Sequence, residues 1–239
     1  MRISLIGRGR LGRTLFALLS ASPHTVELLG RGALPATPDV VVLCVPDGAI
    51  APLAAQLAIG PVLLHCSGAC DLDVLAPHTR IGSLHPLMTF PGPEVGTPDL
   101  AGVPAAVSGT PEALADARAI AATLGLDAVE VPGDRRLYHA AAVIAGNFAT
   151  VLLDAAAEAL AAAGVPADQA PAMLAPLALR SLQNAVPSPR AALTGPAARG
   201  DHATIAAHRE ALVQAGLSEL LSLYDPLTER AIAMSRRDG

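Results

Sequence analysis

The sequence contains no lysine, and all sixteen of its basic residues are arginine. Mechanisms that need a lysine side chain are therefore excluded for this chain, among them a Schiff base, a lysine general acid or base, and the lysine of a phosphate-binding P-loop. Arginine stays charged at physiological pH and suits a clamp on phosphate or carboxylate better than proton transfer. Any proton transfer must use another side chain.

Cysteines and long apolar runs are also scarce. Cys44, Cys66 and Cys70 stand among apolar or small residues, which is typical of reduced interior thiols. No uninterrupted apolar run approaches the roughly 20 residues that span a bilayer, and the run after Met1 is shorter than the core of a signal peptide. The net charge of −5 argues against a general nucleic-acid binder. We therefore expect a cytoplasmic protein with no membrane segment and no nucleic-acid partner.

The first 133 residues alternate short apolar runs with segments of helical period. This alternation predicts βαβ units and a parallel sheet, with strands that helices cover on both faces. The expected strands are RISLIG, TVELLG, DVVVLCV, PVLLHCSG, IGSLHPL, PAAVSG and AVEVP.

Beyond Gly133 the strand pattern stops and helical segments follow. We expect one long helix over 134–164, ending at a glycine, and further helices at about 167–185, 202–224 and 226–235. The sequence therefore predicts an α/β domain over 1–133 and an all-helical domain over 134–239.

A GxGxxG motif, GRGRLG, follows the first expected strand and opens the first expected helix. Glycine permits the tight turn and lets the backbone approach a pyrophosphate at the helix N-terminus. The motif favours a Rossmann-type, doubly wound sheet that binds a dinucleotide, against a plain tight turn or a methyltransferase-type loop. The expected cofactor contacts in the loop and after the third strand are Gly7, Arg8, Gly9, Arg10, Leu11, Gly12, Val45 and Pro46.

The end of the second expected strand indicates which dinucleotide is bound. NAD-binding folds place an acidic residue there for the ribose 2′-hydroxyl, but this chain has Gly30 followed by Arg31. Missing carboxylate repulsion and a nearby guanidinium favour a 2′-phosphate, hence NADP or NADPH, with Arg8 as a second cation. The alternative is that Arg31 is merely solvated.

Ligands in such sheets bind beyond the carboxyl ends of the strands. Asp47 follows the third strand, where capping the next helix is a better explanation than catalysis. Ser67 follows the fourth strand and would place a hydroxyl near the nicotinamide. His85 ends the fifth strand, and Pro86 would mark the point where the ladder stops. Histidines and cysteines here lack metal-ligand spacing, so we expect no metal, and Cys66 is expected to be an inert thiol.

The long helix brings further candidates. Tyr138, His139 and Asn147 lie near its start, and the spacing of His139 and Asn147 keeps both on one broad face. They suit a proton donor and an orienting amide, or equally hydrogen bonds in a domain interface. Later, Asp201 is expected to cap a helix. Arg199 in the preceding loop is a candidate clamp on substrate, as Tyr138 is a candidate substrate contact.

Six segments, GRGRLG, VPDGAI, HCSGA, GSLHPLMTF, YHAAAVIAGNF and LTGPAARGDHATIAAH, span nearly the whole chain. Together they resemble a bacterial family described as NADP-dependent oxidoreductases, with a Rossmann-like N-terminal domain and a C-terminal helical domain of unknown function. The wider superfamily includes 6-phosphogluconate dehydrogenases, pyrroline-carboxylate reductases and deazaflavin-dependent NADP oxidoreductases. Its β-hydroxyacid dehydrogenases use a lysine on the first helix after the sheet, which this chain lacks.

Prephenate dehydrogenases, which are similar in this region, carry a His-Pro after a late strand, and their histidine contacts the hydroxyl that loses hydride. This resemblance implies a catalytic role for His85, and Ser67 matches a serine at the preceding strand end.

These observations predict an NADP(H)-dependent oxidoreductase that moves a hydride to or from a small carbonyl, hydroxyl or imine substrate. His85 or His139 would handle the proton, while Ser67 and Asn147 would orient the oxygen or nitrogen. A non-catalytic NADP(H)-binding sensor or scaffold is the main alternative, and a methyltransferase is a third. The wide apolar faces of the Ala-rich helices, with the resemblance, predict a homodimer through the helical domain.

Overall fold

A computed structural model of the protein describes residues 1–30 and 32–236. The described chain divides into two compact units, Met1–Gly146 and Asn147–Gly239. The division falls one helix after the boundary expected at 133–134, because α4 (Arg135–Ala145) is anchored to the sheet through the buried side chain of Arg135.

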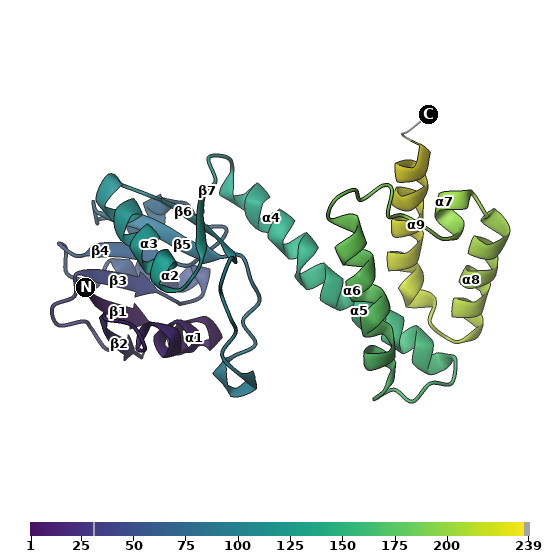
Figure 1. Ribbon diagram of the computed structural model, residues 1–239, viewed down its shortest axis with the longest axis horizontal. Coiled ribbons are helices and arrows are strands. Elements are labelled where there is room, and N and C mark those ends of the chain that lie inside the picture. Colours follow the sequence, from purple (N-terminus) through teal and green to yellow (C-terminus); the bar gives the residue numbers. More distant parts are fainter. Residues whose placement is uncertain (31, 237–239) are drawn as a thin grey trace. The chain divides into compact units, whose positions relative to one another are not determined.

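The first unit is built on one seven-stranded sheet with the order β2-β1-β3-β4-β5-β6-β7 (Figure 1). Every segment expected to be a strand contributes one. The strands are β1 Arg2–Ile6, β2 Thr25–Leu29, β3 Val40–Leu43, β4 Val62–His65, β5 Ile81–Pro86, β6 Pro104–Gly109 and β7 Asp127–Glu130. Between them lie α1 Arg10–Leu19, α2 Asp47–Ala54 and α3 Pro111–Thr123, with short 3-10 turns η1 Leu72–Leu75 and η2 Pro93–Val95.

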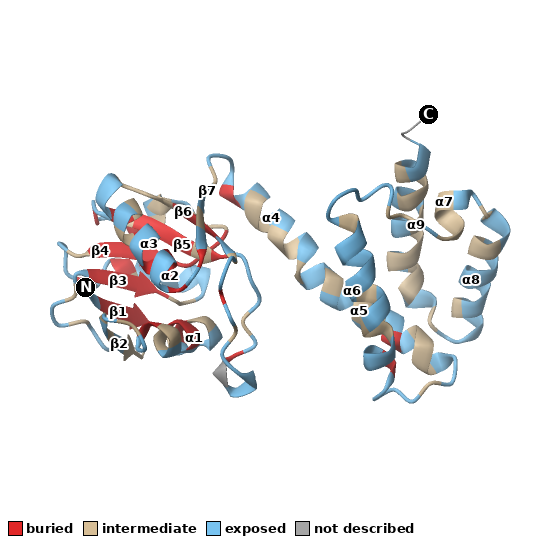
Figure 2. Cartoon of the chain, viewed as in Figure 1, coloured by how far each residue is buried: buried red, intermediate tan, exposed pale blue. Residues whose placement is uncertain are grey.

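Both faces of the central strands are buried, as Figure 2 shows by their red colour. Along β3, Val40 and Val42 pack into the core that contains the buried residues of α1 and α3. Val41 and Leu43 pack into the opposite core with the buried residues of α2. This two-sided burial explains why the central strands read as continuous apolar runs, and the sheet is doubly wound as expected.

The sheet departs from the expected all-parallel arrangement at one pair of strands. β5 is parallel to β4 but antiparallel to β6, with His85 opposite Ala106 and Pro86 opposite Ala105. The expectation that Pro86 marks the end of the ladder is therefore wrong. The ladder with β4 ends at Ser83, whereas the ladder with β6 continues through Pro86 to the amide of Leu87, which donates to the carbonyl of Pro104.

The second unit is helical in the described residues. It contains α5 Asn147–Ala162, α6 Ala170–Ala185, α7 Pro196–Arg199, α8 His202–Gln214, η3 Ser218–Leu220 and α9 Leu221–Ser235. The helix expected over 202–224 instead ends before Gly216, whose φ of +77° suits glycine, and Pro226 lies inside α9.

The helix expected over 134–164 is formed by α4 and α5, with Gly146 between them. The stretch Arg135–Ala162 has the length and apolar composition to cross a membrane, and 6% of its most apolar window is buried. Sequence analysis had expected no membrane segment. A core helix of a soluble protein also meets this test of length and composition, but such a helix is mostly buried, which this stretch is not.

Candidate functional site

The glycine loop joins β1 to α1 and is shaped by close backbone contacts. Gly7 has a φ of +126°, and a Cβ there would lie 2.2 Å from the carbonyl oxygen of Cys44. A Cβ on Gly12 would lie 1.9 Å from the carbonyl oxygen of Gly7. Packing within the protein therefore requires glycine at both positions.

Gly9 differs, because a Cβ there would meet no atom of the described chain within 4 Å. Its φ of −72° also suits any residue. Gly9 is the N-cap of α1, where no side chain caps the helix and the first turn carries no acidic residue. The first backbone amides of α1, starting with those of Arg10 and Leu11, have no partner within the helix. The open space beside Gly9, next to these amides, fits an anionic group such as the pyrophosphate of a dinucleotide.

The neighbouring cofactor candidates lie around this loop. Val45 and Pro46 follow β3, and Val45 Cγ1 would lie 3.2 Å from a Cβ on Gly7. Pro46 is the N-cap of α2. Asp47 is the first residue of α2 and makes no side-chain cap, so the expectation that it caps this helix is wrong.

Arg8 reaches from the loop to the end of β2. Its Nη2 donates to the carbonyl oxygen of Leu28 over 3.5 Å, and its Nε would lie 3.4 Å from a Cβ on Gly30. A guanidinium thus lies where NAD-binding folds carry a carboxylate. Arg31, the other expected phosphate ligand, lies outside the described residues.

His85 is the centre of a cluster of side chains at the carboxyl ends of β4 and β5. Its Nδ1 lies 2.8 Å from the hydroxyl oxygen of Tyr138, and its ring meets that of His139 edge-on with centroids 6.2 Å apart. A Cβ on Gly68 would lie 2.7 Å from His139 Cδ2 and 2.9 Å from His85 Nε2. Gly68 therefore lets both imidazoles close over the loop that follows β4.

Arg135, in the first turn of α4, is hydrogen-bonded to β5, to β6 and to the turn that follows β4. Its Nη2 donates to the carbonyl oxygen of Ser67 over 2.7 Å. Its Nη1 donates to Ser83 Oγ on β5 over 3.0 Å and to Ser108 Oγ on β6 over 3.2 Å. The side chain is almost wholly buried, so the guanidinium is a fixed interior charge.

This environment keeps His85 neutral. Burial lowers the pKa of its imidazole from 6.5 to about 4, and the charges of His139 and Arg135 lower it further than Asp47 raises it. Burial also raises the pKa of the Tyr138 hydroxyl. A neutral imidazole in contact with a neutral phenol can relay a proton, because each group both donates and accepts.

Ser67 has a structural role that the sequence did not reveal. Its hydroxyl oxygen accepts from the amides of Ala69 and Cys70, and its own amide donates to His65 Nδ1 over 3.2 Å. These bonds shape the turn that carries Gly68. Cys66 is buried beside Cys44 with 3.9 Å between the sulfurs, and burial with this contact raises the pKa of the Cys66 thiol, as expected of an inert residue.

Two candidates belong to the second unit. Asn147 begins α5, and Arg199 ends the short helix α7. Asp201 caps α8 as predicted, because its carboxylate accepts from the amide of Thr204 over 3.0 Å.

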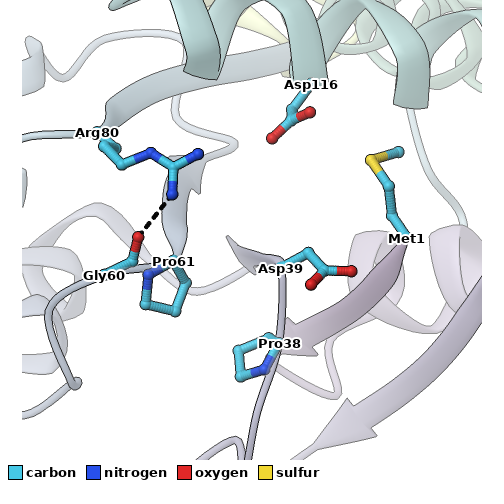
Figure 3. Close-up of a pocket in the computed structure, with 7 residues that line it drawn as sticks. All are labelled: Met1, Pro38, Asp39, Gly60, Pro61, Arg80 and Asp116. Atoms are coloured by element: carbon cyan, nitrogen blue, oxygen red, sulfur yellow. Dashed lines mark hydrogen bonds between the residues drawn. The ribbon is translucent and has the colours of Figure 1, made fainter.

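A pocket of about 460 Å³ opens at the opposite edge of the sheet, where strands begin (Figure 3). Arg80 on its wall donates to the carbonyl oxygen of Gly60 over 2.8 Å, and Asp39 and Asp116 also line it. This pocket lies away from the carboxyl edge that holds the glycine loop and His85.

Arg135 and Gly68 are the functional candidates that sequence analysis missed. The signal for Arg135 was present, since residues 135, 138 and 139 share one helical face. The need for glycine at position 68 depends on two histidines that are distant in sequence, and no local pattern shows it.

The sheet order, the glycine loop after β1 and the side chains at the carboxyl edge define a Rossmann-type α/β protein with a helical unit after it. A family model described as "Domain of unknown function (DUF2520)" matches residues 103–231, and the chain belongs to this family. No curated protein matches the sequence.

Solved structures share the fold along nearly the whole chain. The protein TM1727 from Thermotoga maritima is 23% identical, with a TM-score of 0.73 over 99% of both chains. A "putative NADP oxidoreductase", BF3122 from Bacteroides fragilis, is 23% identical, with a TM-score of 0.77 over 97% of this chain and 98% of the other. A reductive aminase from Aspergillus terreus, in complex with NADPH and ethyl levulinate, is 17% identical, with a TM-score of 0.72 over 98% of this chain and 94% of the other.

Proposed function

We propose that the protein is an NADP(H)-dependent oxidoreductase that transfers a hydride to or from a small carbonyl, hydroxyl or imine substrate. The observation that carries this proposal is the position of two features at one edge of the sheet. The glycine loop follows β1, and the His85 cluster lies at the carboxyl ends of β4 and β5. Strands β1, β3, β4 and β5 are parallel neighbours in that order, so both features lie at the same edge. That edge is where ligands bind in doubly wound folds. The NADP and NADPH that similar structures name support the same cofactor here.

The phosphate groups of the cofactor have fitting groups at the loop. The open space at Gly9 and the first amides of α1 suit the pyrophosphate. Arg8, lying over Gly30, suits a 2′-phosphate as the second cation, beside Arg31, the cation that the sequence places first. When bound, the nicotinamide supplies or accepts the hydride.

The side chains at the strand ends would supply the proton that accompanies hydride transfer. In the reduction direction the substrate carbon gains a hydride, and the electron pair of its double bond moves to oxygen or nitrogen. That atom takes a proton from Nε2 of neutral His85, while Nδ1 takes the proton of Tyr138. A solvent proton then binds Nε2, and Nδ1 returns its proton to Tyr138, which restores both groups. His139, edge-on to His85, is the alternative donor. Asn147 and Arg199 belong to the second unit, and their orienting roles stay predictions from the sequence.

Transfer of deuterium from NADPH tests this function. NADPH labelled at either face of C4 is incubated with the protein and a panel of small ketones, aldehydes and cyclic imines, and products are analysed by mass spectrometry. We expect deuterium from one face in at least one product. His85→Ala should lower turnover about 10²- to 10⁴-fold, the usual contribution of a general acid or base.

NADPH affinity should not change in His85→Ala. His24→Ala removes a histidine beside Thr123, far along the chain from the cluster, and should leave turnover unchanged. Bound NADPH with no transfer to any substrate would contradict the enzyme and favour the sensor or scaffold. Full turnover in both His85→Ala and His139→Ala would remove histidine from the mechanism.

A further inference from the structure

Arg135 is a buried cation without a counterion in the described part of the chain. Its side chain is 7% exposed, yet its hydrogen bonds go only to neutral oxygens, those of Ser67, Ser83 and Ser108. No carboxylate among the described residues lies within ion-pair distance of it, and its Nε is buried without a partner. Burial lowers the pKa of the Arg135 guanidinium, and Tyr138, Asp71 and Cys70, which raise it, do not offset burial. A buried charge without an ion-pair partner costs folding free energy.

Two independent spacings place this charge against His85. Ser83, which accepts from Arg135, is two residues before His85, so both side chains leave the same face of β5 about 7 Å apart. On α4, Arg135 precedes Tyr138 and His139 by three and four residues, which puts all three on one helical face. Both spacings therefore place the guanidinium near the imidazole, on which the charge of Arg135 acts.

We propose that Arg135 is a positioning residue that links β5, β6 and the turn after β4 beside His85 and whose charge opposes a second positive charge on that imidazole. The proposal concerns how the proton is handled in the function proposed above, and its catalytic consequence rests on that function. We assign Arg135 no contact with substrate, because its side chain is buried and its Nη1 and Nη2 are engaged with the three serines.

The charged groups that face His85 determine the sign of the effect. Arg135 and His139 from α4 lower the pKa of His85, and Asp47 from α2 raises it. His65, on the adjacent β4, has its own pKa lowered to about 4 by burial and by Arg135, so it is neutral near pH 7. Removal of the Arg135 charge should therefore raise the pKa of His85, which lies at about 4 in the intact protein.

Histidine titration by NMR tests this directly, and it needs no substrate. The full-length protein is labelled at histidine, and the signal of His85 is identified by its loss in His85→Ala. We expect a midpoint near pH 4 in the intact protein and a higher midpoint in Arg135→Met and Arg135→Gln. Arg135→Lys should keep the low midpoint, because it keeps the charge. An unchanged midpoint in both uncharged variants would overturn the proposal.

Arg136→Gln is the matched control, because Arg136 is the adjacent arginine but is exposed and paired with Asp134. Its His85 midpoint should equal that of the intact protein. Arg135→Met also removes the donors to the Ser67 carbonyl oxygen, to Ser83 and to Ser108, so we expect it to fold with a lower Tm. The His85 midpoint is read in the folded protein, and Arg135→Gln, which keeps a side-chain donor without the charge, should shift it in the same direction.

Turnover gives a second readout that a purely structural role would not move. In the oxidation direction, where neutral His85 accepts the proton, the acid limb of kcat/KM should shift to higher pH in Arg135→Met, in line with the NMR midpoint, and stay in place in Arg136→Gln. If no substrate is turned over by the intact protein, the proposed function fails while the NMR midpoints still decide the role of Arg135.

Discussion

Gly68 is the residue on which the histidine cluster depends most. A Cβ at Gly68 would lie within 3 Å of both imidazole rings. The His85 ring cannot move away without breaking its hydrogen bond to Tyr138. Alanine at this position therefore displaces a ring.

We expect Gly68→Ala to lower turnover by about 10²-fold, the cost of misplacing a catalytic group by about 1 Å. NADPH affinity, measured by fluorescence titration, should be nearly unchanged, because the glycine loop is not involved. Gly133→Ala is the control, since a Cβ there meets nothing within 4 Å, and its turnover should match the intact protein. Equal turnover in Gly68→Ala would show that the cluster is not catalytic.

Single residues show what sequence can predict of the site. His85, Tyr138 and His139 could be predicted because histidine and tyrosine are rare in this chain, and because these three stand at a strand end and near the start of a helix. Arg135 and Arg136 are adjacent arginines that the sequence does not distinguish. In the structure Arg135 is buried as a fixed charge, whereas Arg136 is exposed and pairs with Asp134. Ser67 was found at the correct strand end, but its role follows from a turn whose hydrogen bonds no pattern shows.

The loop between β1 and α1 is the element that decides cofactor binding. Gly7 and Gly12 are required by packing, whereas Gly9 borders open space. Gly9→Val should therefore fold normally, with an unchanged circular dichroism spectrum, but weaken both NADPH and NADH at least about 10-fold by filling the approach to the helix amides.

Arg8→Ala separates the phosphate from the rest of the cofactor. It should weaken NADPH and leave NADH unchanged, because only NADPH carries the 2′-phosphate. Titration of both nucleotides against each variant is the measurement. Full NADPH affinity in Gly9→Val would refute the site, and equal losses for the two nucleotides in Arg8→Ala would refute the phosphate assignment.

Among the elements, the strands were predictable and the direction of one was not. Apolar runs such as VVVL and VLLH are buried on both faces and could only be central strands. The run PAAVSG fits the sheet equally well in either direction, and the chain between β5 and β6 holds no α-helix to impose a parallel crossover. The antiparallel pair is therefore set by this connection.

At the scale of the whole molecule, the apolar surface of the second unit needs a partner. α5 and α6 expose large apolar side chains, among them Phe148 at 52%, Met173 at 64%, Leu177 at 67% and Leu182 at 55%. Soluble monomers rarely expose large contiguous apolar patches. Met173 and Leu177 are four residues apart and share one face of α6. We propose that a second copy of the chain covers this surface, as the composition of the helices predicted.

Light scattering at micromolar concentration tests the dimer. The intact protein should have twice the mass of the chain, and Leu177→Arg should shift it toward the monomer, because a guanidinium buried between two copies would lack a partner. Val213→Arg changes an exposed apolar residue of α8 in the same way and should leave the dimer intact. A monomeric intact protein would contradict the proposal. Sedimentation with lipid vesicles would instead assign the apolar stretch Arg135–Ala162 to a membrane.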